Sequence, residues 1–153
     1  NIRALIVDDE ERARDLLERL LSRIPGIRLC GKASSADEAL EMVISEQPDL
    51  IFLDVQMPGK TGFNLVDYLQ KYMLKAKVVF VTAYAEFAIP ALKVSAFDYL
   101  LKPIKIEDLM TKMAEAFEKK NAHDQKIRKA RIKELLRFPG RVLEHDKEDE
   151  KKS

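Results

Sequence analysis

The sequence contains one cysteine and no apolar stretch long enough to cross a membrane. The single residue, Cys30, excludes an intrachain disulfide and has no cluster of metal ligands around it. A membrane-spanning helix needs roughly 18 consecutive apolar residues, and every run here is shorter. Residues 1–7 form a short apolar run that ends in two aspartates, unlike a secretory signal. We therefore expect a cytoplasmic protein with no membrane partner, in which Cys30 is a small buried side chain.

An excess of charge of one sign is also missing. The chain has 27 basic and 26 acidic residues and a formal net charge of +1, so as a whole it is not a polycation built to coat nucleic acid. Its 153 residues, 46% of them hydrophobic and 35% charged, are typical of a globular protein. That length can bury one good core but is short for two full domains.

Short apolar runs alternate with stretches of helical period. The runs are rich in Val, Ile, Leu and Phe and are bounded by polar or turn residues, which is typical of strands buried on both faces. Five strands that alternate with helices predict a parallel sheet with helices on both faces, an α/β fold. The predicted strands are Ala4–Val7, Ile27–Cys30, Leu50–Leu53, Val78–Val81 and Phe97–Leu101.

The composition changes near residue 120. Residues 119–141 contain nine basic side chains against two acidic ones, and residues 144–153 are charged and poor in apolar side chains. We therefore expect one domain over residues 1–120, followed over 121–153 by a basic helical linker and a disordered tail. An output domain would be absent or truncated.

Polar residues follow four of the predicted strands at their C-terminal ends. In a parallel sheet these ends share one edge, which is where open α/β sheets bind ligands. Each residue alone has an ordinary explanation as a turn, a helix cap or a solvated charge, but together they predict a site. The residues are Asp8, Asp9, Asp54, Thr82 and Lys102.

Three carboxylates in one crevice repel each other unless a cation lies among them. Mg²⁺ prefers a few carboxylate oxygens together with water and phosphate oxygens. One carboxylate can act as a nucleophile toward a phosphoryl donor, and a nearby ammonium and hydroxyl can neutralise the transferred charge. The pattern therefore predicts a magnesium site that handles phosphoryl groups.

These residues and their neighbours resemble the signature blocks of two-component response-regulator receiver domains. The blocks are Val7-Asp8-Asp9, 53–59 (LDVQMPG), Val81-Thr82-Ala83 and Lys102-Pro103, and their order and spacing match over about residues 2–120. The resemblance implies a flavodoxin-like (βα)5 three-layer sandwich with a parallel five-stranded sheet of order 2-1-3-4-5. The stretch 82–104 is similar to receivers that precede LytTR-type DNA-binding domains.

The resemblance also implies the role of each acid. Asp54 would be the phosphoacceptor, and Asp9 would bind Mg²⁺ directly while Asp8 orients metal-bound water. The backbone carbonyl of Gln56 would complete the protein ligands of the metal.

The remaining site residues would respond to the phosphoryl group. Lys102 would pair with it, and the Lys102-Pro103 bond would be cis. Thr82 would be the switch hydroxyl and Tyr99 the rotating aromatic. Pro90 departs from the family's pattern, because it falls where a fourth helix is expected.

The implied function is to accept a phosphoryl group from a sensor histidine kinase, without the turnover of a conventional enzyme. Phosphorylation would change the surface over residues 83–120, favour a homodimer and control transcription, with DNA bound only through a missing LytTR-type domain. A stand-alone receiver that acts by protein–protein contacts is the alternative.

Two enzyme or carrier classes compete with this interpretation, and the sequence disfavours both. A flavodoxin-type electron carrier needs a hydroxyl-rich phosphate loop after the first strand, where residues 8–11 are all acidic. A Mg²⁺-dependent phosphatase with an aspartyl nucleophile needs a second acid two residues later, where this chain has Gln56. A scaffold that is never phosphorylated would not need the full set of site residues.

Overall fold

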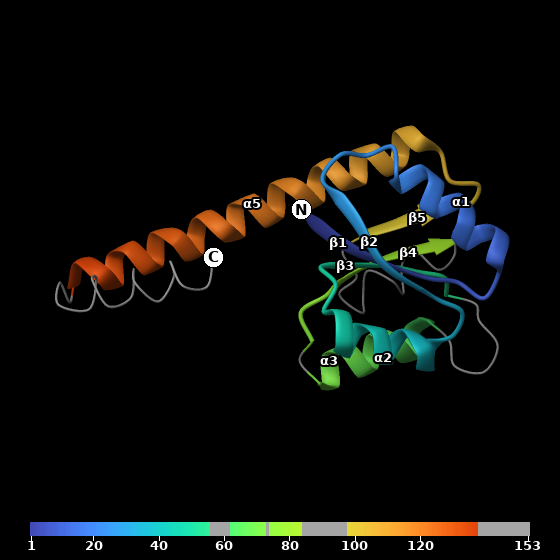
Figure 1. The fold of residues 1–153 in the computed structure, drawn as a ribbon, viewed down its shortest axis with the longest axis horizontal. Coiled ribbons are helices and arrows are strands. Elements are labelled where there is room, and N and C mark those ends of the chain that lie inside the picture. The colour runs from blue at the N-terminus through green and yellow to red at the C-terminus, as the bar shows by residue number, and fades with distance from the viewer. Residues whose placement is uncertain (56–61, 73, 84–97, 138–153) are drawn as a thin grey trace. The chain divides into compact units, whose positions relative to one another are not determined.

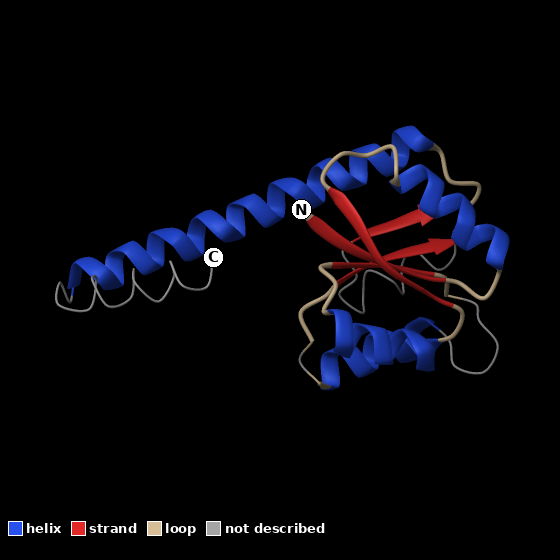
Figure 2. Ribbon diagram, in the orientation of Figure 1, coloured by secondary structure: helices blue, strands red, loops and turns tan. Residues whose placement is uncertain are grey.

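Five parallel strands form a single sheet in the order β2-β1-β3-β4-β5, as predicted (Figures 1 and 2). The computed structural model describes residues 1–55, 62–72, 74–83 and 98–137. Each described strand overlaps a predicted apolar run and differs from it by only a few residues at its ends. The strands are β1 Ile2–Val7, β2 Ile27–Ala33, β3 Leu50–Leu53, β4 Lys77–Thr82 and β5 Asp98–Leu101.

Helices cover both faces of this sheet. Helix α1 and the first turns of α5 lie on one face, and α2 and α3 lie on the other (Figure 2). The chain divides into two compact units, residues 1–112 and 113–153, and α5 begins in the first and continues in the second. No helix in the described part of the chain is long and apolar enough to cross a membrane. The helices are α1 Glu11–Leu21, α2 Ala36–Glu46, α3 Gly62–Lys71 and α5 Ile106–Arg137.

The central strands are buried on both faces over Ala4–Val7, Leu50–Leu53 and Val78–Val81, which explains why these stretches are entirely apolar. Successive side chains of a strand point to opposite faces, so β1 sends Leu5 and Val7 into the core under α2 and α3. Its alternate side chain Ile6 faces α1, where it lies close to Leu17 and Phe52. A strand that contributes to two cores leaves no position for a polar residue until it ends.

The start and end of α2 are set by local chemistry. Ser35 has an extended backbone, and its Oγ accepts a hydrogen bond from the backbone N–H of Glu38 at 3.2 Å. The Glu38 carboxylate in turn accepts bonds from the N–H and hydroxyl of Ser34. Gln47 ends the helix in the left-handed conformation, with φ of 48°. The serine pair therefore caps this helix.

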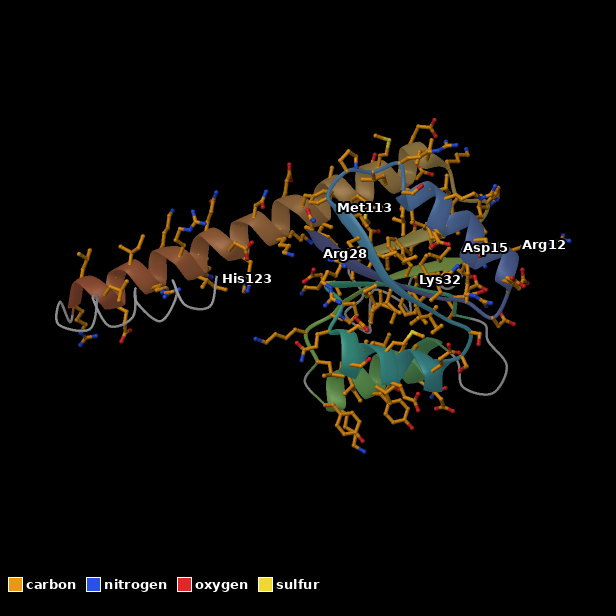
Figure 3. All side chains as sticks on the ribbon, in the orientation of Figure 1. Arg12, Asp15, Arg28, Lys32, Met113 and His123 are labelled. Carbon is orange, nitrogen blue, oxygen red and sulfur yellow. The ribbon has the colours of Figure 1, made fainter. Side chains whose placement is uncertain are left out.

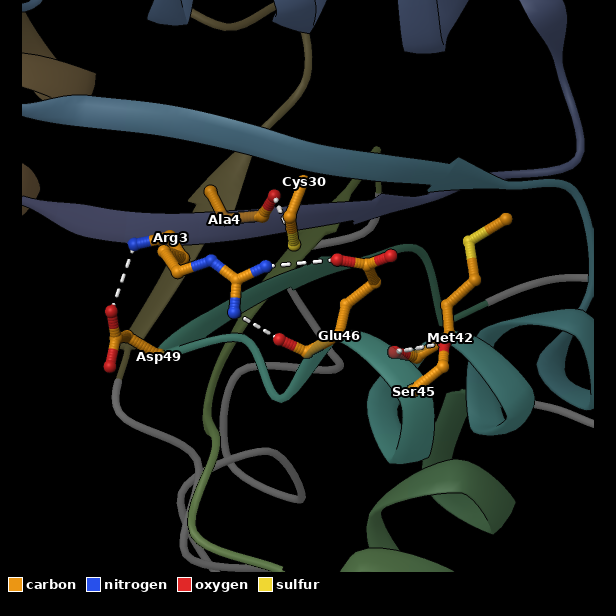
Figure 4. Close-up of polar contacts among 7 residues, drawn as sticks. All are labelled: Arg3, Ala4, Cys30, Met42, Ser45, Glu46 and Asp49. Atoms are coloured by element: carbon orange, nitrogen blue, oxygen red, sulfur yellow. Dashed lines mark hydrogen bonds and ion pairs between the residues drawn. The ribbon is translucent and has the colours of Figure 1, made fainter. Parts of the chain in front are cut away.

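A polar cluster closes the edge of the sheet opposite the strand ends that carry the predicted site (Figure 4). The Arg3 guanidinium donates to the backbone carbonyl of Glu46 and, at 2.9 Å, to its Oε2, while the Arg3 N–H donates to Asp49 Oδ2 at 2.8 Å. Cys30 is half-buried rather than fully buried, and its Sγ donates to the Ala4 carbonyl at 3.2 Å. Burial raises the pKa of the Cys30 thiol, partly offset by the positive charge of Arg3, so the thiolate is disfavoured.

We expect Ser35→Ala to lower the free energy of unfolding by about 1 kcal/mol, because the Glu38 N–H loses its partner at the start of α2. Urea unfolding followed by circular dichroism measures the change. The matched control is Ser45→Ala in the exposed last turn of the same helix, which should cost little or nothing. Equal losses in the two variants would contradict the capping role.

Candidate functional site

The register of β1 and β3 places Asp8 and Asp54 side by side. Val7 pairs with Leu53, the last residue of β3, so the next residue on each strand is an aspartate. The Asp54 N–H donates to the Val7 carbonyl at 2.9 Å, which extends the strand ladder into the site. The side chains of Asp8 and Asp54 are only 7% and 13% exposed. The spacing of the two acids is therefore set by backbone hydrogen bonds.

Lys102 follows β5, the edge strand of the sheet, and its ammonium group reaches both acids. Its backbone N–H donates to the Thr82 carbonyl at 2.8 Å, which fixes the residue beside the end of β4. Strand β4 separates β5 from β3 by two strand spacings, about 10 Å, and the lysine and aspartate side chains together bridge this gap. The ammonium nitrogen lies 2.8 Å from Asp8 Oδ2 and 3.1 Å from Asp54 Oδ2.

The pKa of Lys102 reflects two opposing effects. Burial lowers it, but the hydrogen bonds and negative charges of Asp8 and Asp54 outweigh burial and raise it above its ordinary value. The side chain is therefore positively charged at neutral pH. The peptide bond between Lys102 and Pro103 is cis, as the resemblance implied.

Asp9 completes a cluster of three carboxylates. One oxygen from each of Asp8, Asp9 and Asp54 lies within 4.8 Å of the others. Counted with the Lys102 ammonium, the four groups carry a formal charge of −2, which a divalent cation would balance. Hard carboxylate oxygens at this spacing suit Mg²⁺, so the donors fit the ion that the sequence predicted.

The two aspartates of the first loop differ in how they are held. Every polar atom of Asp8 has a partner: its N–H donates to Ala33, its carbonyl accepts from Arg14, and its carboxylate accepts from Glu10 and Lys102. Asp9 is exposed and is free to turn toward an ion. That Asp9 contacts the metal while Asp8 orients water around it stays a prediction.

Arg14, in the first turn of α1, is a site residue that sequence reasoning missed. Its Nη1 donates to the Asp8 carbonyl oxygen at 2.6 Å. A cation near a helix N-terminus is electrostatically unfavourable, and that placement is the one sequence signal that could have marked it.

The remaining predicted residues differ in how fully the structure places them. Thr82 ends β4 with its side chain 2% exposed, between the strands that carry Asp54 and Lys102. Tyr99 lies on β5, the strand that pairs with β4, and is half-buried against the core under α2 and α3. Gln56, predicted to ligate the metal, and Pro90 lie outside the described residues.

An apolar recess of about 130 Å³ adjoins the acidic cluster. Side chains of α1, including Leu16, form one wall, and Pro103 and Ile104 form another. Asp8 and Lys102 also line it, so the recess and the site share two residues.

Comparison with known proteins agrees with this geometry. The family model for the response regulator receiver domain matches residues 4–114, most of the chain. The chain belongs to the response regulator receiver family. The receiver domain is 38% identical over 109 residues to the sensory transduction protein LytT of Bacillus cereus. It is 43% identical over 116 residues to the positive alginate biosynthesis regulatory protein of Pseudomonas aeruginosa.

These matches cover 71% and 75% of this chain but only 44% and 45% of the relatives. The chain therefore spans a little under half the length of the curated relatives it matches.

Solved receiver structures share the fold. The response regulatory domain of MrkE from Klebsiella pneumoniae superimposes with a TM-score of 0.69 at 28% identity, covering 74% of this chain and 93% of that one. The response regulator domain of CheB from Thermotoga maritima gives a TM-score of 0.66 at 28% identity, covering 77% and 94%. Both the family and the flavodoxin-like fold predicted from sequence are confirmed.

We expect Lys102→Met to lower the free energy of unfolding by about 1–3 kcal/mol in a buffer without divalent cations. The change leaves the largely buried carboxylates of Asp8 and Asp54 without a counter-charge. Urea unfolding in low salt with a chelator measures the loss.

The matched control for this variant is Lys32→Met. Lys32 also bridges two carboxylates, those of Asp15 and Glu18, but the carboxylates of that cluster are 49% and 44% exposed (Figure 3). Water can solvate these acids once the lysine is gone, so the control should lose clearly less stability. A control that loses as much as Lys102→Met would show that burial of the acids is not what matters.

Proposed function

We propose that this receiver domain accepts a phosphoryl group on Asp54 in a Mg²⁺-dependent reaction and converts it into a change of surface. The observation that supports this most strongly is the cluster of three carboxylates at the C-terminal edge of the sheet, two of which contact the Lys102 ammonium. It offers a nucleophile, a cation site and a fixed positive charge within one pocket.

Asp9 and Asp54 are the proposed direct ligands of Mg²⁺, with Asp8 orienting its water and the backbone carbonyl of Gln56 as a further ligand. When bound, the ion would balance the excess negative charge of the acids and of the incoming phosphoryl group. Lys102 contributes the rest of that compensation from the protein itself.

In the proposed transfer, a carboxylate oxygen of Asp54 attacks the phosphorus of a donor phosphohistidine. The new P–O bond forms as the P–N bond breaks, and the imidazole leaves with the electron pair and takes a proton from solvent. Lys102 shifts its ammonium from the carboxylates to the phosphoryl oxygens. Water later hydrolyses the acyl phosphate, which releases inorganic phosphate and restores the Asp54 carboxylate.

The phosphoryl group is larger and more negative than the carboxylate it modifies. Thr82 ends the strand between Asp54 and Lys102, so its hydroxyl is the proposed donor that follows the new oxygens. Tyr99 on the neighbouring strand then moves inward, which shifts a two-state equilibrium. The surface over residues 83–120 is the proposed output face. We propose that phosphorylation favours a homodimer formed through this face.

The proposed donor is a sensor histidine kinase, and the proposed location is the cytoplasm. Residues 1–120 form the proposed receiver, and 121–153 a connecting segment. The relatives extend beyond the matched region, and one is named as a regulator of biosynthesis, which supports a regulatory output. Transcriptional control through a LytTR-type DNA-binding domain is the proposed form of that output. A receiver that acts alone through protein contacts is the alternative.

We expect the protein to gain the mass of one phosphoryl group when it is incubated with Mg²⁺ and a small phosphodonor such as acetyl phosphate. Asp54→Asn should gain none, because the amide is not a nucleophile, and a chelator should suppress the gain in the wild type. Intact-mass spectrometry measures both. The control is Asp67→Asn on the exposed face of α3, which should be modified like the wild type.

For the switch we compare Thr82→Val, which keeps the volume of the side chain, with Thr82→Ser, which keeps its hydroxyl. Both variants should still be phosphorylated at Asp54. The NMR signals of the Tyr99 ring should shift on phosphorylation in the wild type and in Thr82→Ser but not in Thr82→Val. A full shift in Thr82→Val would remove the hydroxyl from the proposed mechanism.

A further inference from the structure

Arg14 occupies a position where a cation costs free energy. It lies in the first turn of α1, whose N-terminus carries the positive end of the helix dipole. Its neighbour Arg12 is exposed and points away from the domain (Figure 3), whereas Arg14 is half-buried against the turn that carries the acids. A specific contact therefore holds Arg14 in place.

Arg14 is tied to both residues that flank Asp9. Its Nη1 donates to the carbonyl oxygen of Asp8 at 2.6 Å, and its backbone N–H donates to the carbonyl oxygen of Glu10 at 3.1 Å. The Glu10 N–H then donates to Asp8 Oδ1 at 3.0 Å, which closes the turn. Of the carboxylates in this turn, that of Asp9 lies with those of Asp8 and Asp54 in the acidic cluster.

We propose that Arg14 is a positioning residue for the cation site. Its guanidinium anchors the Asp8 carbonyl to α1, which fixes the backbone just before Asp9 and so directs the Asp9 carboxylate toward those of Asp8 and Asp54. This inference rests on the proposed function, because it assumes that the three acids bind a divalent cation. A guanidinium suits this task, since its planar fork holds a fixed direction toward the carbonyl.

Electrostatics and positioning predict opposite effects when Arg14 is removed. Loss of a positive charge close to a cation site should strengthen binding of Mg²⁺. Loss of the anchor should weaken it, because Asp9 must then be ordered when the ion binds. The sign of the change in affinity therefore separates the two roles without any measurement of phosphorylation.

The experiment is calorimetric titration of the folded protein with Mg²⁺ and with Mn²⁺, for the wild type, Arg14→Met, Arg14→Lys and Arg12→Met. We expect Arg14→Met to raise the Kd about tenfold. Arg14→Lys, which can still donate to the Asp8 carbonyl, should recover part of the affinity. Arg12→Met removes the same charge from the same turn, and its Kd should stay equal or fall.

Three outcomes decide the matter. An Arg14→Met protein that binds as tightly as the wild type, or more tightly, overturns the positioning role and leaves the proposed function standing. A wild type that binds neither ion overturns the proposed function itself. If circular dichroism shows that Arg14→Met is unfolded, Arg14→Gln takes its place, and unchanged affinity there would overturn the positioning role in the same way.

Discussion

The structure depends on how one ammonium group balances acids that the backbone forces together. Adjacent parallel strands end at Val7 and Leu53, so Asp8 and Asp54 cannot move apart without breaking the ladder between them. Lys102 alone bridges both carboxylates among the described contacts, and it enters from β5, across the end of β4. The backbone therefore sets the positions of Asp8 and Asp54, and the Lys102 side chain supplies the positive charge between them.

Much of the fold and the site follows from the sequence for identifiable reasons. Strands buried on both faces must be apolar throughout, so the first polar residue marks the strand end, and parallel strands bring those ends to one edge. That reasoning located Asp8, Asp54, Thr82 and Lys102 without any coordinates. The capping role of the serines before α2 also follows from the sequence, because capping is local and depends on a few consecutive residues.

What the sequence did not reveal depends on long side chains and on the path of the backbone. Arg14 binds a carbonyl oxygen, which every residue possesses, so no partner residue type marks the contact. The unequal roles of Asp8 and Asp9 emerge only when the neighbours of each are known. Periodicity also overestimates burial: Leu16 and Met110 continue apolar stripes, yet they are 41% and 54% exposed.

The recess beside the acids has a consequence for chemical selectivity. Its apolar walls meet the acidic cluster at Asp8 and Lys102, so a phosphodonor of the kind proposed for Asp54 would also face an apolar surface. A small hydrated phosphodonor would gain no binding free energy from the apolar side chains of Leu16 and Ile104. A donor that carries its phosphoryl group beside an apolar surface would remove water from that wall as it docks, so contacts away from the phosphorus would favour such donors in the proposed transfer.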